Sequence, residues 1–227
     1  RAEKKLPVLI YNRGGNGNFG SVIFGSMMHN LFPIAKEGFV IIGSQYRGVH
    51  TRTDTLDEFG GKDVKDVTAL IDLIPSIKGA DANRIGMYGA SRGGMQTHLA
   101  VKQTNSIKAI ATIAGNTDLS KGLTYRPAME KVYIKRIPNY LENKKAELDK
   151  RSVLTWVEQL SPKIPILLLH GTDDKRVSVK HSEDFALALS KNNIPHKIVL
   201  YPGDNHGLIK NREKANSELV QWFHKFL

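Results

Sequence analysis

The stretch Gly89-Ala90-Ser91-Arg92-Gly93-Gly94 decides the fold, because it places a serine between glycines where a strand gives way to a helix. Residues 84–88 (Arg-Ile-Gly-Met-Tyr) predict a short strand, and residues 93–101 predict a helix that packs small residues. A serine on a strained strand-to-helix turn holds its hydroxyl clear of the backbone, and glycines on either side avoid collisions with the adjoining elements. The stretch therefore predicts a nucleophilic Ser91.

Two further stretches follow Ser91 in a meaningful order, an aspartate pair and then a histidine. Serine, aspartate, histidine is the chain order of the catalytic triad in the α/β-hydrolase fold. The order predicts a hydrolase in which Ser91 attacks, His206 takes its proton and an aspartate orients the imidazole. The residues alone leave open whether the acid is Asp173 or Asp174, since the other of the two could cap the helix expected near Ser178.

His206 is the preferred base because it lies in a loop rich in turn-forming residues, 201–207, that leaves the last predicted strand. The other histidines fit this role less well. His98 falls on the helix after the serine, and His170 ends a strand, where we expect it to shape the following loop.

Apolar runs that alternate with helical patterns predict a mostly parallel sheet with helices on both faces. Strands are expected at residues 7–11, 39–43, 84–88, 108–113, 164–169 and 196–200, and helices at about 26–36, 63–74, 93–101 and 212–227. We predict one α/β-hydrolase catalytic domain over residues 1–227, with a sheet of at least six strands. The usual fold has two more strands at its beginning, so N-terminal strands are expected to be missing.

Residues 117–160 interrupt this alternation with a mixture of charged, aromatic and aliphatic side chains. Because they follow the strand at 108–113, we expect a cap-like helical excursion over the catalytic edge of the sheet. Two interpretations remain open, a cap that shapes the substrate site and an excursion that only packs on the domain.

The composition limits the partners. A net charge of +11 on 227 residues is basic, but acidic residues are mixed among the lysines and arginines, so we expect a solvated surface and no nucleic acid. The charge favours acidic substrates or anionic surfaces by steering. No apolar run is long enough to cross a bilayer. The chain has no cysteine, which excludes disulfides. It begins at Arg1 rather than at a methionine, so both a cytoplasmic and a secreted or periplasmic location stay open. The oligomeric state is left open as well.

Five segments carry a resemblance to a known family. They are residues 45–48 (Gln-Tyr-Arg-Gly), 60–67 (Gly-Gly-Lys-Asp-Val-Lys-Asp-Val), 81–85 (Asp-Ala-Asn-Arg-Ile), 89–94 and 170–177 (His-Gly-Thr-Asp-Asp-Lys-Arg-Val). They resemble the Asn-Tyr-Arg-Gly, Gly-x-x-Asp-x-x-Asp-Val, Asp-Pro-x-Arg-Ile, Gly-x-Ser-x-Gly-Gly and His-Gly-x-x-Asp-x-x-Val motifs of the prolyl oligopeptidase family of serine peptidases. The resemblance extends over nearly the whole chain, implies chemistry without metal or cofactor, and selects Asp174, which lies three residues before the valine.

The oxyanion of the transition state needs preorganised donors. We expect the N–H of Arg92, after the nucleophile, and that of Gly15 in the glycine-rich loop 13–16. This loop lacks the Gly-Lys-Ser/Thr ending of a phosphate loop. The family commonly has a tyrosine after the nucleophile and His-Gly-Gly-Pro or a tyrosine in the loop, and this chain has neither. The guanidinium groups of Arg13 and Arg92 are candidates for binding an anionic substrate, with pairing to local acids as the alternative.

The expected function is cleavage of peptide or small ester substrates through an acyl-enzyme. A carboxylesterase of broad specificity is the first alternative, because esterases and peptidases share the triad and this chain has neither the β-propeller of many family members nor the oxyanion tyrosine. A non-catalytic binding module on a hydrolase scaffold is the alternative of another class, and the intact triad argues against it.

Overall fold

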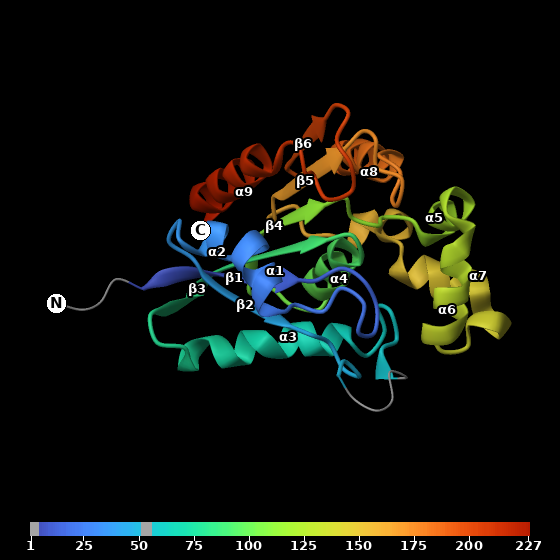
Figure 1. Cartoon of the computed structure of the whole chain (residues 1–227), viewed down its shortest axis with the longest axis horizontal. Coiled ribbons are helices and arrows are strands. Elements are labelled where there is room, and N and C mark those ends of the chain that lie inside the picture. The colour runs from blue at the N-terminus through green and yellow to red at the C-terminus, as the bar shows by residue number, and fades with distance from the viewer. Residues whose placement is uncertain (1–4, 51–55) are drawn as a thin grey trace.

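The computed structural model describes residues 5–50 and 56–227, and at its centre lies one parallel sheet (Figure 1). The strands are β1 (Leu6–Asn12), β2 (Val40–Ser44), β3 (Ala80–Ala90), β4 (Ile107–Ile113), β5 (Ile166–Gly171) and β6 (His196–Tyr201). Their order in the sheet is β2-β1-β3-β4-β5-β6, and every neighbouring pair is parallel. All six predicted strands are present, and the predicted α/β-hydrolase sheet is confirmed.

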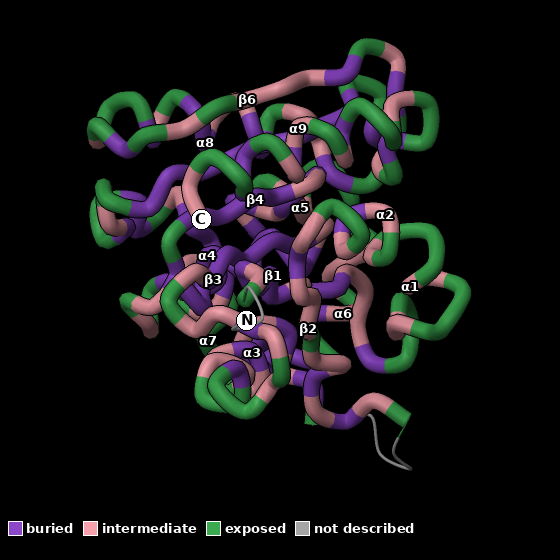
Figure 2. Tube along the Cα trace, turned by 90° about the vertical axis from the view of Figure 1, so that its left-hand side faces the viewer, coloured by how far each residue is buried: buried purple, intermediate pink, exposed green. Residues whose placement is uncertain are grey.

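Helices cover both faces of the sheet, as the continuous apolar strands require. One face carries α3 (Val64–Leu73), α4 (Arg92–Val101) and α8 (Lys180–Lys191), and the other carries α2 (Phe32–Ala35) and α9 (Arg212–Phe226). Successive strand residues point to opposite faces, so Leu9 packs into the α2–α9 cluster while Ile10 packs into the other. Buried segments therefore gather in the strands, with exposed residues on the surrounding helices (Figure 2).

The helix expected over residues 26–36 is wrong in one respect. It is divided into α1 (Phe24–Asn30) and α2, with Leu31 between them. Pro33 occupies the first turn of α2. Proline has no N–H and its ring clashes with the preceding turn, so a new helix begins there rather than one helix passing through.

The segment 117–160 forms α5 (Leu119–Tyr125), α6 (Glu130–Arg136) and α7 (Tyr140–Arg151), grouped beyond the carboxyl ends of the strands (Figure 1). Tyr133 and Tyr140 are buried in the same cluster as α3 and α4. The phenol of Tyr125 donates to the carbonyl of Asp174 at 2.8 Å, which fastens α5 to the loop after β5.

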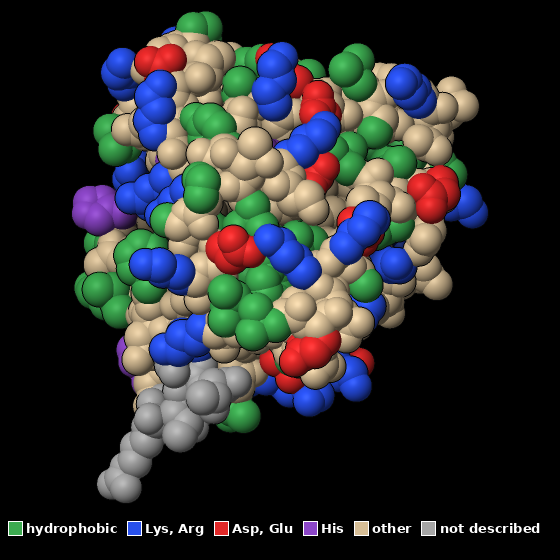
Figure 3. Space-filling model, turned by 90° about the vertical axis from the view of Figure 1, so that its right-hand side faces the viewer, with side chains coloured by type: hydrophobic (Ala, Val, Ile, Leu, Met, Phe, Trp, Pro, Cys, Tyr) green, Lys and Arg blue, Asp and Glu red, His purple; other side chains and the backbone are tan. Residues whose placement is uncertain are grey.

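Lys and Arg side chains are interspersed with Asp and Glu on the face that bears these helices (Figure 3). Within residues 5–50 and 56–227, no helix has the length and apolar character needed to span a membrane.

His98 on α4 makes the fold sensitive to acid. It is 1% exposed, packs edge-on against Phe185, and within the described part of the chain neither ring nitrogen has a hydrogen-bond partner. Burial lowers the pKa of His98 from 6.5 to about 3. Between these two pH values His98 is therefore protonated in the unfolded chain and neutral in the folded chain. Stability should fall as pH drops below 6.5, by up to about 1.4 kcal/mol per pH unit from this residue.

The check is urea unfolding at several pH values between 7 and 4.5 for the parent, His98→Met and His29→Met. His98→Met should flatten the pH dependence, while substitution of the exposed His29 should not. An unchanged slope in His98→Met would show that other groups cause the acid sensitivity.

Candidate active site

Ser91 stands on the turn between β3 and α4 with φ 58° and ψ −120°, a conformation that L residues rarely adopt. The flanking glycines are required by close packing. A Cβ at Gly89 would overlap the carbonyl of Gly93, and one at Gly93 would overlap the carbonyl of Asn12 on the neighbouring strand β1. The predicted strand-turn-helix around the serine is therefore present, and the turn raises Ser91 at the carboxyl end of the sheet.

The structure brings His206 to Asp174 and not to Asp173. Asp174 Oδ2 lies 2.6 Å from His206 Nδ1, and Asp174 is 2% exposed. Its other oxygen accepts the N–H groups of Arg176 at 2.7 Å and Val177 at 3.0 Å. Asp173 is exposed to solvent. The register of the His-Gly-x-x-Asp-x-x-Val motif thus pointed to the aspartate that contacts the histidine.

A second histidine holds the same carboxylate. His170 Nε2 lies 3.2 Å from Asp174 Oδ2 and 3.0 Å from the carbonyl of Val177, both acceptors, so this nitrogen carries the proton. Its Nδ1 then accepts from the hydroxyl of Ser182 at 2.7 Å. The sequence predicted that His170 shapes the loop, and its contact with the acid was missed.

These contacts settle the charge of Asp174. Burial favours the neutral acid, but the hydrogen bonds from His170 and His206, the charge of His206 and the Val177 N–H outweigh it. The pKa of Asp174 therefore lies well below its usual range. The carboxylate is ionised wherever the protein is folded near neutral pH.

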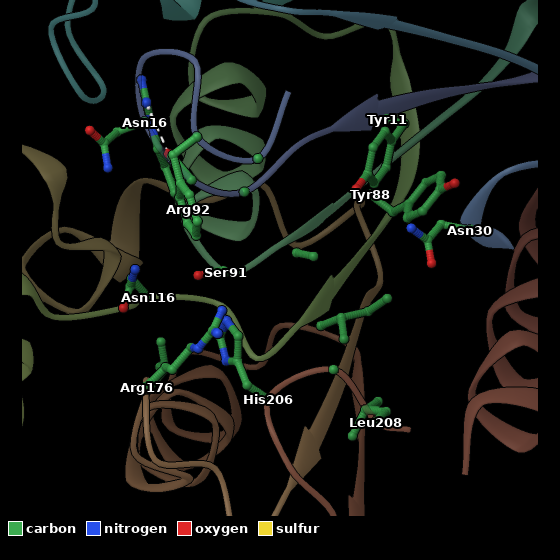
Figure 4. A pocket seen from close by; sticks show the side chains of 18 of the residues that line it. Tyr11, Asn16, Asn30, Tyr88, Ser91, Arg92, Asn116, Arg176, His206 and Leu208 are labelled. Carbon is green, nitrogen blue, oxygen red and sulfur yellow. Dashed lines mark hydrogen bonds between the residues drawn. The ribbon is translucent and has the colours of Figure 1, made fainter. Parts of the chain in front are cut away.

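Ser91 and His206 line one cavity of about 560 Å³ at the carboxyl ends of the strands (Figure 4). Within the described residues the Ser91 hydroxyl makes no hydrogen bond. In unliganded enzymes such bonds are often long and tighten only when substrate binds. Ser91 and His206 therefore line the same cavity, and no hydrogen bond joins their side chains.

Both predicted oxyanion donors line this cavity as well. Gly15 has φ 76°, and a Cβ there would overlap the carbonyl of Phe19, so only glycine fits this turn. The backbone of Asn16 pairs with that of Phe19 at 3.1 and 3.0 Å, which fixes the loop beside Ser91. The loop and the first turn of α4 thus face the same space.

The placement of Arg13 does not agree with its predicted substrate-binding role. Arg13 is 1% exposed and does not line the cavity. Its guanidinium makes five hydrogen bonds to backbone carbonyls, those of Gly14, Gly17, Phe19 and, twice, Gln45. These contacts use the guanidinium to brace the glycine-rich loop, because a buried charge needs all its donors paired.

The Arg92 side chain belongs to a buried ion cluster. It pairs with both oxygens of Asp57 at 2.8 and 2.6 Å and with Asp63 at 2.7 Å. The rings of Tyr46 and Phe59 lie 5.0 and 4.6 Å from its guanidinium carbon. Pairing with local acids, the alternative for this arginine, is what the structure has.

Asp57 links this cluster to the end of the glycine-rich loop, because its Oδ2 also accepts the N–H of Gly17, the residue directly after the loop, at 2.6 Å. Burial disfavours its charge, but the hydrogen bonds and charge of Arg92 and the N–H groups of Gly17 and Phe59 prevail and lower the pKa of Asp57. One carboxylate therefore connects the loop to the residue after Ser91.

Sequence reasoning missed three arginines that line the cavity, Arg126, Arg176 and Arg212. The only sequence signal was their basic character, which many surface residues share. Within the described residues no cluster of three or more His, Asp or Glu side chains could hold a metal ion.

A parallel sheet, a serine on a strand-to-helix turn and an Asp-His pair beside it define an α/β-hydrolase. The model of the prolyl oligopeptidase family matches residues 25–227, and the chain belongs to this family of serine peptidases. The acylamino-acid-releasing enzyme of Rattus norvegicus is 28% identical over 98% of the chain and 32% of that enzyme. The uncharacterized peptidase YtmA of Bacillus subtilis is 25% identical over 94% of the chain and 81% of that protein.

The fold is also similar to solved structures. A Mycobacterium tuberculosis puromycin-hydrolyzing peptidase superposes with a TM-score of 0.84 at 24% identity, over 100% of this chain and 35% of that one. An acylaminoacyl peptidase of Pyrococcus horikoshii gives 0.83 at 23% identity, over 100% of this chain and 38% of that one. The chain spans about a third of the length of the first curated relatives that it matches.

Proposed function

We propose that this chain cleaves acyl bonds of peptides or small esters by a serine-hydrolase mechanism. The observation that carries the proposal is the 2.6 Å hydrogen bond between Asp174 and His206 at the wall of the cavity that Ser91 also lines. A serine hydroxyl is a weak nucleophile and needs an adjacent base, and a base needs a fixed tautomer. Asp174 accepts the Nδ1 proton of His206, which leaves Nε2 free to take the proton of Ser91.

In this mechanism Ser91 Oγ bonds to the carbonyl carbon of the substrate while its proton passes to His206. The N–H groups of Arg92 and Gly15 are proposed to bind the oxyanion. His206 then gives the proton to the departing amine or alcohol, and an acyl-enzyme remains. A water oxygen then bonds to the acyl carbon while its proton passes to His206, and His206 returns the proton to Ser91 Oγ as the acyl–serine bond breaks and the carboxylic acid leaves.

The test is covalent labelling with an uncharged alkyl fluorophosphonate, in which the serine oxygen displaces fluoride from phosphorus. The folded protein should gain one adduct, mapped by peptide mass analysis to Ser91. Ser91→Ala should lose all labelling. Ser217→Ala should label like the parent, because Ser217 is exposed on α9 and does not line the cavity. A folded protein that gains no adduct would instead be a binding module without catalysis.

A substrate panel distinguishes a peptidase from a carboxylesterase. N-acetyl amino acids would be offered as paired p-nitrophenyl esters and p-nitroanilides. We expect turnover of the amides, because the chain belongs to a peptidase family. Cleavage of an amide also needs protonation of the leaving amine, and His206 is proposed to supply that proton. Turnover of esters alone would make the chain a carboxylesterase.

A further inference from the structure

The charged side chains that line the catalytic cavity are basic. Arg126, Arg176 and Arg212 line the cavity, and no aspartate or glutamate is among the residues that line it. None of these three side chains has an ion pair or hydrogen bond within residues 5–50 and 56–227. Arg92 lines the cavity too, but Asp57 and Asp63 already neutralise it. Among the residues that the structure describes, the side chains of Arg126, Arg176 and Arg212 therefore carry positive charges toward the cavity that no acidic side chain pairs with.

Two of the arginines lie at one end of the site. Arg126 follows α5 directly, and the preceding residue, Tyr125, donates its phenol to the carbonyl of Asp174 at 2.8 Å. Arg176 is two residues after Asp174, so this bond fastens the two arginine-bearing segments together. In the view of Figure 4, Arg176 and His206 lie below Ser91, whereas Tyr11 and Tyr88 lie to its upper right and Leu208 to its lower right. Arg212 begins α9, close in sequence to Leu208.

The surroundings of the pair suit a charged group on an apolar stem. Met129 and Val132 line the cavity after Arg126, and Val177 lines it after Arg176. Guanidinium groups donate in a planar fork that matches a carboxylate. A ligand with a short aliphatic chain that ends in a carboxylate would satisfy both features, while an amine would face two cations.

We propose that Arg126 and Arg176 bind a carboxylate of the substrate, so that the site selects acidic peptides or esters. The inference rests on the proposed function for its catalytic meaning, but the binding of an anion can be measured separately. It specifies a substrate class through residues that do not take part in proton transfer.

The test uses two ligands that differ only in charge, N-acetyl-glutamic acid α-amide and N-acetyl-glutamine α-amide. Each is added as a competitor while Ser91 is labelled by the uncharged fluorophosphonate, and each is also titrated into the protein by calorimetry. The acidic ligand should protect Ser91, and bind, at a concentration about 10- to 100-fold lower than the neutral ligand, as expected for charge-assisted hydrogen bonds. The preference should shrink in high salt.

Matched variants locate the site. Arg126→Gln and Arg176→Gln should each reduce the preference about tenfold. The neighbouring cations Lys131 and Lys175 are exposed and do not line the cavity, so Lys131→Gln and Lys175→Gln should keep it. Arg212→Gln should also keep it, since Arg212 begins α9 and is not on the two segments that the Tyr125–Asp174 bond joins.

The outcomes separate the two proposals. Equal binding of both ligands overturns the inference and leaves the proposed function intact if Ser91 is labelled. The same is true if Lys175→Gln costs as much as Arg176→Gln, because the preference would then come from net charge alone. Selective binding without any adduct on Ser91 supports the anion site and removes the proposed catalysis.

Discussion

Asp174→Asn is expected to lower kcat by about 10⁴ while the protein stays folded. Every partner of this side chain is a donor: Arg176 N–H and Val177 N–H at Oδ1, His206 Nδ1 and His170 Nε2 at Oδ2. A carboxylate accepts all of these bonds, but an amide can accept on one side only. If its NH₂ faces His206, the imidazole must turn its unprotonated Nδ1 to the amide, and Nε2 then carries a proton. His206 could no longer accept the proton of Ser91.

The measurement is kcat on the best ester or amide of the panel, together with the rate of fluorophosphonate labelling. Asp173→Asn is the matched control, since it makes the same substitution one residue earlier at an exposed side chain. Circular dichroism would show that both variants are folded. A folded Asp174→Asn that retained kcat within tenfold of the parent would remove Asp174 from the proposed triad.

Arg92→Met is expected to lower the free energy of unfolding by about 3–5 kcal/mol. The substitution leaves Asp57 and Asp63 buried at 0% exposure without the cation that neutralises them. Adding Asp57→Asn and Asp63→Asn to Arg92→Met should restore part of the loss, because the uncompensated charges are then gone. The measurement is the midpoint of urea unfolding.

The control is the same substitution at a partly exposed ion pair. Arg47 lies 2.6 Å from Asp66, with side chains 32% and 22% exposed, so solvent screens this pair and Arg47→Met should cost less than Arg92→Met, about 1 kcal/mol. If Arg92→Met and Arg47→Met lowered the unfolding midpoint by the same amount relative to the parent, burial of the Arg92 cluster would add nothing to the cost of losing an ion pair. If Arg92→Met does not fold at all, the variant with both asparagines still reports whether removal of the charges rescues it.

The sheet could be predicted because its signal is local. Each strand is an apolar run between turn-forming residues, and a strand buried on both faces needs little else. The single helix expected at 26–36 was wrong because the apolar spacing continues across Pro33 while the backbone cannot. Both interpretations of residues 117–160, a cap that shapes the substrate site and an excursion that only packs on the domain, stay predictions.

The triad candidates could also be predicted from the sequence, for a different reason. Chain order and strand ends place Ser91 and His206 at one edge of a parallel sheet, and a family motif selects Asp174 over Asp173. Which arginines face the cavity is decided by tertiary packing instead. Arg13 adjoins the glycines of the loop and is buried against carbonyls, whereas Arg176 follows the acid and lines the cavity. Nothing in the composition distinguishes these two positions.

The carboxylate shared by Gly17 and Arg92 has a consequence for how the loop behaves over time. Glycine-rich connections are usually among the first segments of a protein to open, since few side chains hold them. Here, opening the turn at Gly17 would also disturb the buried Asp57–Arg92 ion pair. The loop should therefore exchange its amide hydrogens together with the interior of the domain rather than ahead of it, which would hold its N–H groups in one arrangement over time.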